Sequence, residues 1–247
     1  QWEDFSKQRA FSILDQYREQ VLSFNDDIQG TGAMAFAGIL TALKISGQAL
    51  KEQVFIIFGA GAGGVGTARQ LYTAFIKEGL SADEAKLRIY TLDSRGLVTV
   101  GRNGVDAYKI PFAHEPALIS DWRLATPARV SLLDTIINAR GTVLIGTSGQ
   151  PNTFTEEIAS AMLANTPRPI IFPLSNPTSK TEAHPADLYR WTAGKAIVAT
   201  GSPFPPVEHN GIRHRIGQGN NAFVFPGIGL GALSVRARQI TADMCTA

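Results

Sequence analysis

The 247-residue chain alternates between short apolar runs and longer amphipathic segments. Apolar runs bounded by glycine or polar residues are typical of parallel strands covered by helices on both sides. Longer stretches with apolar residues at helical spacing separate these runs. The alternation predicts an α/β fold, a Rossmann-like doubly wound, mostly parallel sheet with helices on both faces. The expected strands are Gln53–Phe58, Leu87–Leu92, Thr142–Gly146, Pro169–Leu174 and Ala196–Thr200.

Helical periodicity and capping signals predict the segments between these strands. Ser81 with Glu84, and Thr153 with Glu156, have the spacing of a capping box, in which each side chain bonds the other residue's backbone N–H. Each pair therefore predicts the start of a helix. The other expected helices are an amphipathic one over Trp2–Val21, a buried one over 32–46, one ending near Gly79, one over Leu132–Arg140 and one from about Gly231.

A glycine-rich turn follows the first expected strand. The letters GAGAGG fit the pattern G-x-G-x-x-G with Gly59, Gly61 and Gly64, and Ala60 lies between the first two. Gly59 would form the tight turn, Gly61 would let a pyrophosphate approach the backbone, and Gly64 would allow close helix–strand packing. The helix N-terminus would supply N–H groups to the phosphates. The position of this glycine-rich turn between a strand and a helix favours dinucleotide binding over a purely structural role.

The next expected strand ends at Asp93, where a Rossmann-type site has an acid that binds the ribose. Its distance from the glycine turn exceeds the usual spacing, because a short extra helix intervenes. Ser94 and Arg95 follow directly. Arg95 could pair with a 2′-phosphate and favour NADP, or it could be a solvated turn residue, so the sequence leaves NAD or NADP open.

Two pairs of adjacent acids stand near the N-terminus, Glu3 with Asp4 and Asp26 with Asp27. Each pair has a structural explanation, helix-dipole complementation by the first and N-capping by Asn25 or Asp26 in the second. Together they could converge if the first helix folds back on the NDD segment. Such hard oxygen ligands suit Mg²⁺ or Mn²⁺, and no His or Cys lies nearby to favour zinc.

Composition narrows the class of protein. The formal charge is +2, and no Lys/Arg cluster suggests a nucleic-acid partner. No apolar stretch approaches the roughly 20 residues of a membrane span, so no membrane partner is expected. The single cysteine, Cys245, rules out an internal disulfide and suits a reducing compartment, which leads us to expect a cytoplasmic protein.

Many motifs in one order resemble the NAD-binding part of malic enzymes over essentially the whole chain. They are WEDF, FNDDIQGT, the glycine turn, LDSRGL, PFAH, SGQ with FTEE, RPIIFPLSNPTSK, WTAGKAIVATGSPF, IGQGNNAFVFPGIGLG and ITADM. The resemblance implies oxidative decarboxylation of malate to pyruvate and CO₂ with NAD or NADP and Mg²⁺ or Mn²⁺. It also implies that the full-length protein is a homo-oligomer.

The resemblance also implies residue roles and a domain plan. Residues 1–30 would form a helix and metal-binding loop, and residues 31–247 the NAD(P)-binding domain. The implied roles are metal ligands Glu3, Asp4 and Asp27; catalytic acid Asp26; cofactor contacts Gly59, Ala60, Gly61, Gly64, Asp93 and Ser94; a nicotinamide and substrate contact, Asn176; and substrate contacts Asn220 and Asn221.

The resemblance implies one absence as well. In the family, a general-base lysine, a general-acid tyrosine and a malate-binding arginine precede WEDF. The chain is therefore expected to bind dinucleotide but to turn over malate poorly by itself. A malolactic enzyme, which releases lactate, and a non-catalytic dinucleotide-binding module remain the alternatives.

Overall fold

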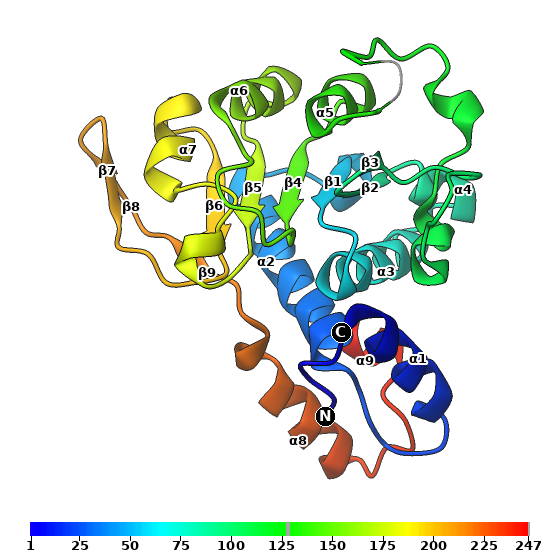
Figure 1. Ribbon diagram of the computed structural model, residues 1–247. Helices are drawn as coiled ribbons and strands as arrows, with labels where there is room; N and C mark the ends of the chain where they lie inside the picture. Colours follow the sequence, from blue (N-terminus) through cyan, green and yellow to red (C-terminus); the bar gives the residue numbers. More distant parts are fainter. Residues whose placement is uncertain (127–128, 247) are drawn as a thin grey trace.

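A seven-stranded sheet in the order β3-β2-β1-β4-β5-β6-β9 forms the centre of the protein (Figure 1). This computed structural model describes residues 1–126 and 129–246. Within the seven-stranded sheet, neighbouring strands run parallel except β2 and β3. The strands are β1 (Phe55–Phe58), β2 (Ile89–Asp93), β3 (Gly96–Leu97), β4 (Val143–Gly146), β5 (Ile170–Pro173), β6 (Ile197–Thr200), β9 (Gly217–Gln218) and a separate hairpin of β7 (Val207–His209) and β8 (Ile212–His214).

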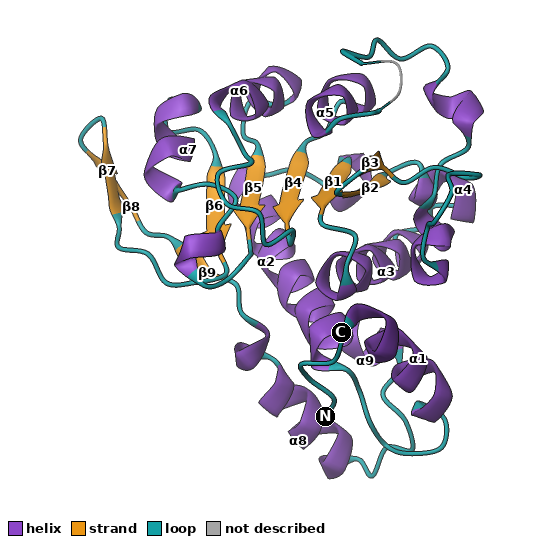
Figure 2. Cartoon of the chain, viewed as in Figure 1, coloured by secondary structure: helices purple, strands orange, loops and turns teal. Residues whose placement is uncertain are grey.

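Helices cover both faces of this sheet (Figure 2). In Figure 1, α2 and α3 lie on one side of the strands, and α5, α6 and α7 on the other. The α-helices are α1 (Lys7–Tyr17), α2 (Thr31–Ser46), α3 (Ala62–Lys77), α4 (Ala82–Lys86), α5 (Leu132–Ala139), α6 (Glu156–Asn165), α7 (Pro185–Trp191), α8 (Phe225–Ser234) and α9 (Ala242–Thr246). Shorter helical turns are η1 (Asp26–Gly30), η2 (Leu50–Glu52), η3 (Ala107–Phe112), η4 (Pro116–Ile119), η5 (Thr178–Lys180) and η6 (Asn221–Phe223). The predicted fold class is confirmed.

Strand β1 contributes side chains to two hydrophobic clusters, one on each face of the sheet. Phe55 and Ile57 pack in the cluster formed with α2 and α3, whereas Ile56 and Phe58 pack in the cluster with α5, α6 and α7. All four side chains are buried. Successive strand residues point to opposite faces, so a strand covered on both sides must be apolar at every position.

The order of strands reverses between β1 and β4. From β1 the chain proceeds to β2 on one side, and returns to β4 on the other. In doubly wound sheets, ligands bind outside the carboxyl ends of the strands at such a reversal. A ligand site is therefore expected at the turn that follows β1.

Several predicted element boundaries are wrong. The first helix covers Lys7–Tyr17 rather than Trp2–Val21, because Trp2 pairs with Asn25 and Asp4 has a non-helical φ of 62°. The cap of α6 is Thr155, whose side chain accepts from the Ile158 N–H, and not Thr153. The chain closes with two helices, α8 and α9, rather than one helix from Gly231. The capping box of Ser81 with Glu84 is confirmed.

The length of the second helix also departs from expectation. Turn η1 is a π-helix that runs directly into α2, so Asp26–Ser46 forms one 21-residue apolar helix. By length and composition alone this helix could cross a membrane, so the expectation that no apolar stretch has this length is wrong. The most apolar window of this helix is 56% buried inside the protein, as in the core helix of a globular fold.

Candidate functional site

The turn after β1 has the shape that the glycine pattern predicts. Gly59 has φ 118°, a conformation that favours glycine, and a Cβ there would lie 2.5 Å from the Thr147 carbonyl oxygen. The backbone N–H groups of Gly59 and Ala60 both donate to Leu92 O, at 2.9 and 2.8 Å. These bonds fasten the turn to the end of β2.

The start of α3 lies directly above this turn. A Cβ on Gly64 would sit 2.1 Å from Gly59 O, so the helix can approach the turn only without a side chain at this position. No side chain caps the helix at Gly61. The first N–H groups of α3 are therefore available to an anion, and the helix dipole favours negative charge there.

Lys7 of α1 extends over the same turn. A Cβ built on Gly61 would lie 3.4 Å from Lys7 Cε and 3.9 Å from Lys7 Nζ. An ammonium group is thus placed where the phosphates of a dinucleotide would meet the helix N-terminus. No local sequence pattern predicts this contact, because Lys7 lies 52 residues before Gly59 in the chain.

Asp93 lies at the end of β2, but its carboxylate already has cationic partners. Oδ2 accepts from Arg102 Nη2 at 2.5 Å and from Lys109 Nζ at 3.2 Å, while Oδ1 accepts from the Arg95 N–H at 2.9 Å. Burial alone would raise the pKa of Asp93, but these three donors outweigh it and hold that pKa below its usual value. The acid is ionised and held in one orientation at the predicted ribose position.

Arg95 is an exposed turn residue, which is one of the two alternatives that the sequence left open. Its guanidinium donates to Asn103 O and Gly104 O, both at 2.7 Å, and so closes the loop that follows β3. Ser94, predicted as a cofactor contact, accepts from Arg129 Nη2 through its carbonyl at 3.1 Å. Lys109, only 8% exposed, and Arg102 are the cations nearest Asp93, and no sequence pattern singled them out.

The N-terminal acids approach the NDD segment as the sequence analysis anticipated, although through an extended segment rather than through the first helix. Trp2 pairs with Asn25 as in a parallel strand, with the Asp26 N–H donating to Trp2 O at 2.8 Å. The Asp4 N–H donates to Asp27 Oδ2 at 3.0 Å, and Gln1 Nε2 bridges Glu3 and Asp26 at 3.1 and 3.0 Å. The four acids thus lie as two neighbouring pairs.

The electrostatics of these pairs fit a hard cation. Burial and then the nearby Glu3 raise the pKa of Asp26 to about 6, and burial raises the pKa of Asp27. Asp26 Oδ1 is buried without a hydrogen-bond partner. A divalent ion would offset both the burial and the repulsion. However, in residues 1–126 and 129–246 no three His, Cys, Asp or Glu side chains are arranged to hold a metal. The donor chemistry fits, but the ligand geometry is not preassembled.

Asn25 explains why the NDD segment turns into a helix here. Its side chain caps η1 by accepting from the Ile28 N–H at 3.0 Å, which decides between the two predicted caps. Asp26 is left free of capping and is 0% exposed. Its Oδ2 accepts from Asn221 Nδ2 at 3.1 Å, across 195 residues of sequence. Asn220, by contrast, caps η6 through the Ala222 N–H. Of the two predicted substrate amides, the structure brings Asn221 to the acids.

Asn176 is exposed just beyond the carboxyl end of β5. It follows the buried Ser175, whose hydroxyl and N–H both donate to Glu182. Glu182 also accepts from the backbone and hydroxyl of Ser148, at the end of β4. Glu182 was not predicted as a site residue, because nothing in the letters TSKTE signals a buried carboxylate.

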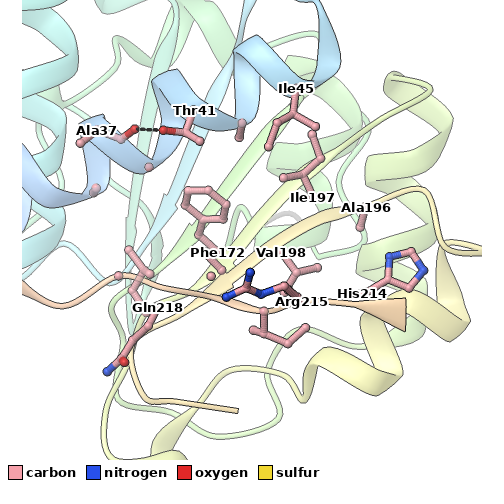
Figure 3. Close-up of a pocket in the computed structure, with 18 of the residues that line it drawn as sticks. Ala37, Thr41, Ile45, Phe172, Ala196, Ile197, Val198, His214, Arg215 and Gln218 are labelled. Atoms are coloured by element: carbon pink, nitrogen blue, oxygen red, sulfur yellow. Dashed lines mark hydrogen bonds between the residues drawn. The ribbon is translucent and has the colours of Figure 1, made fainter. Parts of the chain in front are cut away.

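A separate cavity of about 870 Å³ lies between α2 and the strands β5, β6 and β9 (Figure 3). Figure 3 shows Phe172, Ile197 and Val198 on its wall and the Arg215 side chain reaching into it. None of the predicted site residues lines this cavity. The candidate dinucleotide site is instead the edge of the sheet formed by the glycine turn and the ends of β2, β4 and β5.

Known proteins are similar to this chain in sequence and in fold. NAD-dependent malic enzyme 3 of Bacillus subtilis (strain 168) is 45% identical over 244 residues, covering 98% of the chain and 43% of that protein. The malolactic enzyme of Leuconostoc mesenteroides is 46% identical over 247 residues, covering 100% of the chain and 45% of that protein. The chain therefore spans less than half the length of these relatives.

Solved structures agree with these relatives. The crystal structure of Entamoeba histolytica malic enzyme matches with a TM-score of 0.74 and 29% identity, covering 99% of the chain and 45% of that structure. The malic enzyme of Pyrococcus horikoshii Ot3 matches with the same TM-score and identity, covering 99% of the chain and 51% of that structure. Residues 28–247 match the family model described as malic enzyme, NAD binding domain, and the chain therefore belongs to the malic enzyme family and carries its NAD-binding domain.

Proposed function

We propose that this chain binds NAD or NADP for the oxidative decarboxylation of malate to pyruvate and CO₂, with Mg²⁺ or Mn²⁺. The observation that carries the proposal is the glycine turn under the uncapped start of α3, at the point where the strand order reverses. Asp93 at the end of β2 and Lys7 above the turn supply the charges that ribose hydroxyls and phosphates require.

The acids near the N-terminus would hold the metal. Glu3, Asp4 and Asp27 are the proposed ligands, and Asp26 is the proposed catalytic-site carboxylate beside them, which orients the catalytic groups. When bound, the metal ion would polarise the substrate oxygens and the dinucleotide would accept the hydride. Asn176 and Asn221 can donate amide hydrogens to a substrate carboxylate without adding another titrating charge.

Rapid turnover of malate requires an acid and a base as well. Each such group contributes roughly 10²–10⁴-fold to a typical enzyme rate. The chain spans less than half of its curated relatives. The resemblance implies that both groups belong to a segment before WEDF. We therefore expect the purified chain to bind dinucleotide and to turn over malate negligibly. Robust malate-dependent NAD(P)H formation by this chain would contradict that expectation.

A glycine variant tests the cofactor site without disturbing the fold. Gly61 has φ −95°, and the three atoms nearest to a Cβ there, at 3.4 to 3.9 Å, belong to the flexible Lys7 side chain. Gly61→Ala should keep the melting temperature but weaken NAD⁺ binding at least tenfold, because the methyl group occupies the space of the pyrophosphate. Gly227→Ala is the matched control, since a Cβ on Gly227 meets nothing within 4 Å. Equal affinities of the two variants would refute the site.

The metal ligands can be tested separately. Asp27→Asn should weaken Mn²⁺ binding far more than dinucleotide binding, and Asp15→Asn, which changes an exposed acid of α1, should affect neither. Binding can be followed by titration calorimetry with MnCl₂ and with NAD⁺. Equal losses for both ligands in Asp27→Asn would count against the assignment.

Malolactic activity is the second candidate, because the malolactic relative and the malic relative are almost equally similar to this chain. The two reactions give different products from malate. Formation of pyruvate and net NADH by the complete protein would support malic enzyme activity. Formation of lactate without net NADH would support malolactic activity instead.

A further inference from the structure

Glu182 is a buried carboxylate between two loops of the candidate site. It is 0% exposed and follows η5. Oε1 accepts from the N–H and the hydroxyl of Ser148, both at 2.8 Å, and from the Ser175 hydroxyl. Oε2 accepts from the Ser175 N–H at 3.3 Å. One side chain thus binds the loops that follow β4 and β5.

The bonds explain how a carboxylate can be buried here. An ionised carboxylate away from water is strongly unfavourable unless it is paired or hydrogen-bonded. Across the described residues, no Lys, Arg or His side chain forms an ion pair or hydrogen bond with Glu182. All of its compensation comes from the two serines, so the carboxylate holds the two loops at a defined separation.

The same network continues to the glycine turn. The Gly149 N–H donates to the Ser175 hydroxyl at 2.8 Å, which adds a second link between the loops. The Thr147 hydroxyl donates to Gly59 O at 2.9 Å. The ends of β1, β4 and β5 are therefore joined by two sets of side-chain hydrogen bonds, which the backbone from Thr147 to Ser148 connects.

Strand β4 leaves space for this carboxylate. A Cβ on Gly146 would lie 2.5 Å from Glu182 Cδ and 2.8 Å from a ring carbon of Phe154. The last residue of β4 is consequently one where a side chain would displace Glu182. The backbone of Glu182 is fixed as well, because its carbonyl accepts from the Phe154 N–H at 2.9 Å.

We propose that Glu182 is a positioning residue for the nicotinamide half of the dinucleotide. The inference rests on the proposed dinucleotide site, in which Gly59 and Asp93 hold the adenosine and phosphate half at β1 and β2. In a doubly wound sheet the other half of the ligand crosses the switch point toward β4 and β5. Glu182 fixes the Ser148 loop and the turn that carries Asn176, so it acts on that half without touching it.

Two ligands separate this role from general stability. NAD⁺ contains the nicotinamide half, and ADP-ribose lacks the nicotinamide ring. Glu182→Gln keeps an acceptor for Ser148 but turns an NH₂ group toward the Ser175 N–H, so that two donors face each other. We expect the Kd of NAD⁺ to rise about tenfold and that of ADP-ribose to stay within twofold, a difference of about 1.4 kcal/mol.

Matched variants and a melting curve complete the experiment. Glu157→Gln changes an exposed glutamate of α6 and should alter neither Kd. Ser175→Ala removes the hydroxyl that joins Glu182 to Gly149, and it replaces Glu182→Gln in the titrations if that variant melts below the assay temperature. It should show the same selective loss of NAD⁺ affinity.

Each outcome of the titrations supports or contradicts the positioning role of Glu182. An unchanged NAD⁺ Kd, or equal losses for NAD⁺ and ADP-ribose, would overturn the positioning role. So would an unmodified protein that binds NAD⁺ no more tightly than ADP-ribose, although the dinucleotide site would stand. Failure of the unmodified protein to bind either ligand would instead refute the proposed function, and the positioning role with it.

Discussion

Replacement of Asp93 by asparagine tests how the end of β2 is held together. The side chains of Asp93, Lys109 and Arg102 are only 11%, 10% and 17% exposed. The carboxylate of Asp93 neutralises both cations, so Asp93→Asn leaves two poorly solvated positive charges without this partner. Removing one partner of a buried ion pair costs about 3–5 kcal/mol, whereas exposed pairs are worth about 0–1 kcal/mol. Lys109 retains Asp106 as a partner, so we expect a loss of about 3 kcal/mol.

Urea unfolding at pH 7 measures this loss. The control is Asp187→Asn, which breaks an exposed pair with Arg190 and should cost less than about 1 kcal/mol. A loss below about 1 kcal/mol for Asp93→Asn would refute the reasoning, since the site would then behave like a surface pair. In a double-mutant cycle, Lys109→Met should cost much less in the Asp93→Asn background. Additive losses would show that the two groups do not interact.

The pH dependence of Asp93 has a definite sign. Its pKa is lower in the folded protein than the unfolded value of about 3.9. Its contribution to stability is therefore fully present above that pH and is lost as the pH falls through the folded pKa. The acid limb of the stability curve should be shallower in Asp93→Asn than in the unmodified protein.

Three further variants examine other parts of the site and its supporting core. Lys7→Ala should raise the Kd of NAD⁺ severalfold, and the difference should shrink in high salt if the ammonium acts on phosphates, whereas a salt-independent difference would contradict this. Gly146→Ala should destabilise the protein by about 1–3 kcal/mol in urea, because the new methyl group overlaps Glu182; a change below about 0.5 kcal/mol would contradict the close packing. Burial lowers the pKa of His114, so its stabilising effect is present above the unfolded pKa of about 6.5 and is lost as the pH falls toward the folded pKa. The stability of His114→Gln should vary less over that range, and identical pH profiles would refute the role of this histidine.

Local patterns were sufficient for the regular part of the fold. The five predicted strands all form, because each is a short apolar run that can be buried on both faces. The glycine turn also has the predicted shape, since a positive φ at Gly59 and a backbone contact at Gly64 exclude side chains there. The short edge strands β3 and β9 were not predicted. Two residues cannot show a periodicity, and their pairing depends on a neighbouring strand.

The candidate site was predictable only in part, for the same reason. Its acids and amides stand in recognisable motifs, but their partners come from distant parts of the chain. Asn221 reaches Asp26 across 195 residues, and Lys7 reaches the glycine turn from another helix. Arg102, Lys109 and Glu182 carry no local signal, because a charged residue in a polar loop looks the same whether it is solvated or buried.

The sequence by itself therefore determined the strands, the helix-start signals and the glycine turn, which follow from the size, polarity and backbone freedom of neighbouring residues. The tertiary structure alone decided which charges meet. It placed two cations on Asp93, brought Asn221 and the N-terminal acids to Asp26, and buried Glu182 between two loops. The physical reason is that electrostatic and hydrogen-bond energies depend on distance and on exclusion of water, and the packed fold sets both.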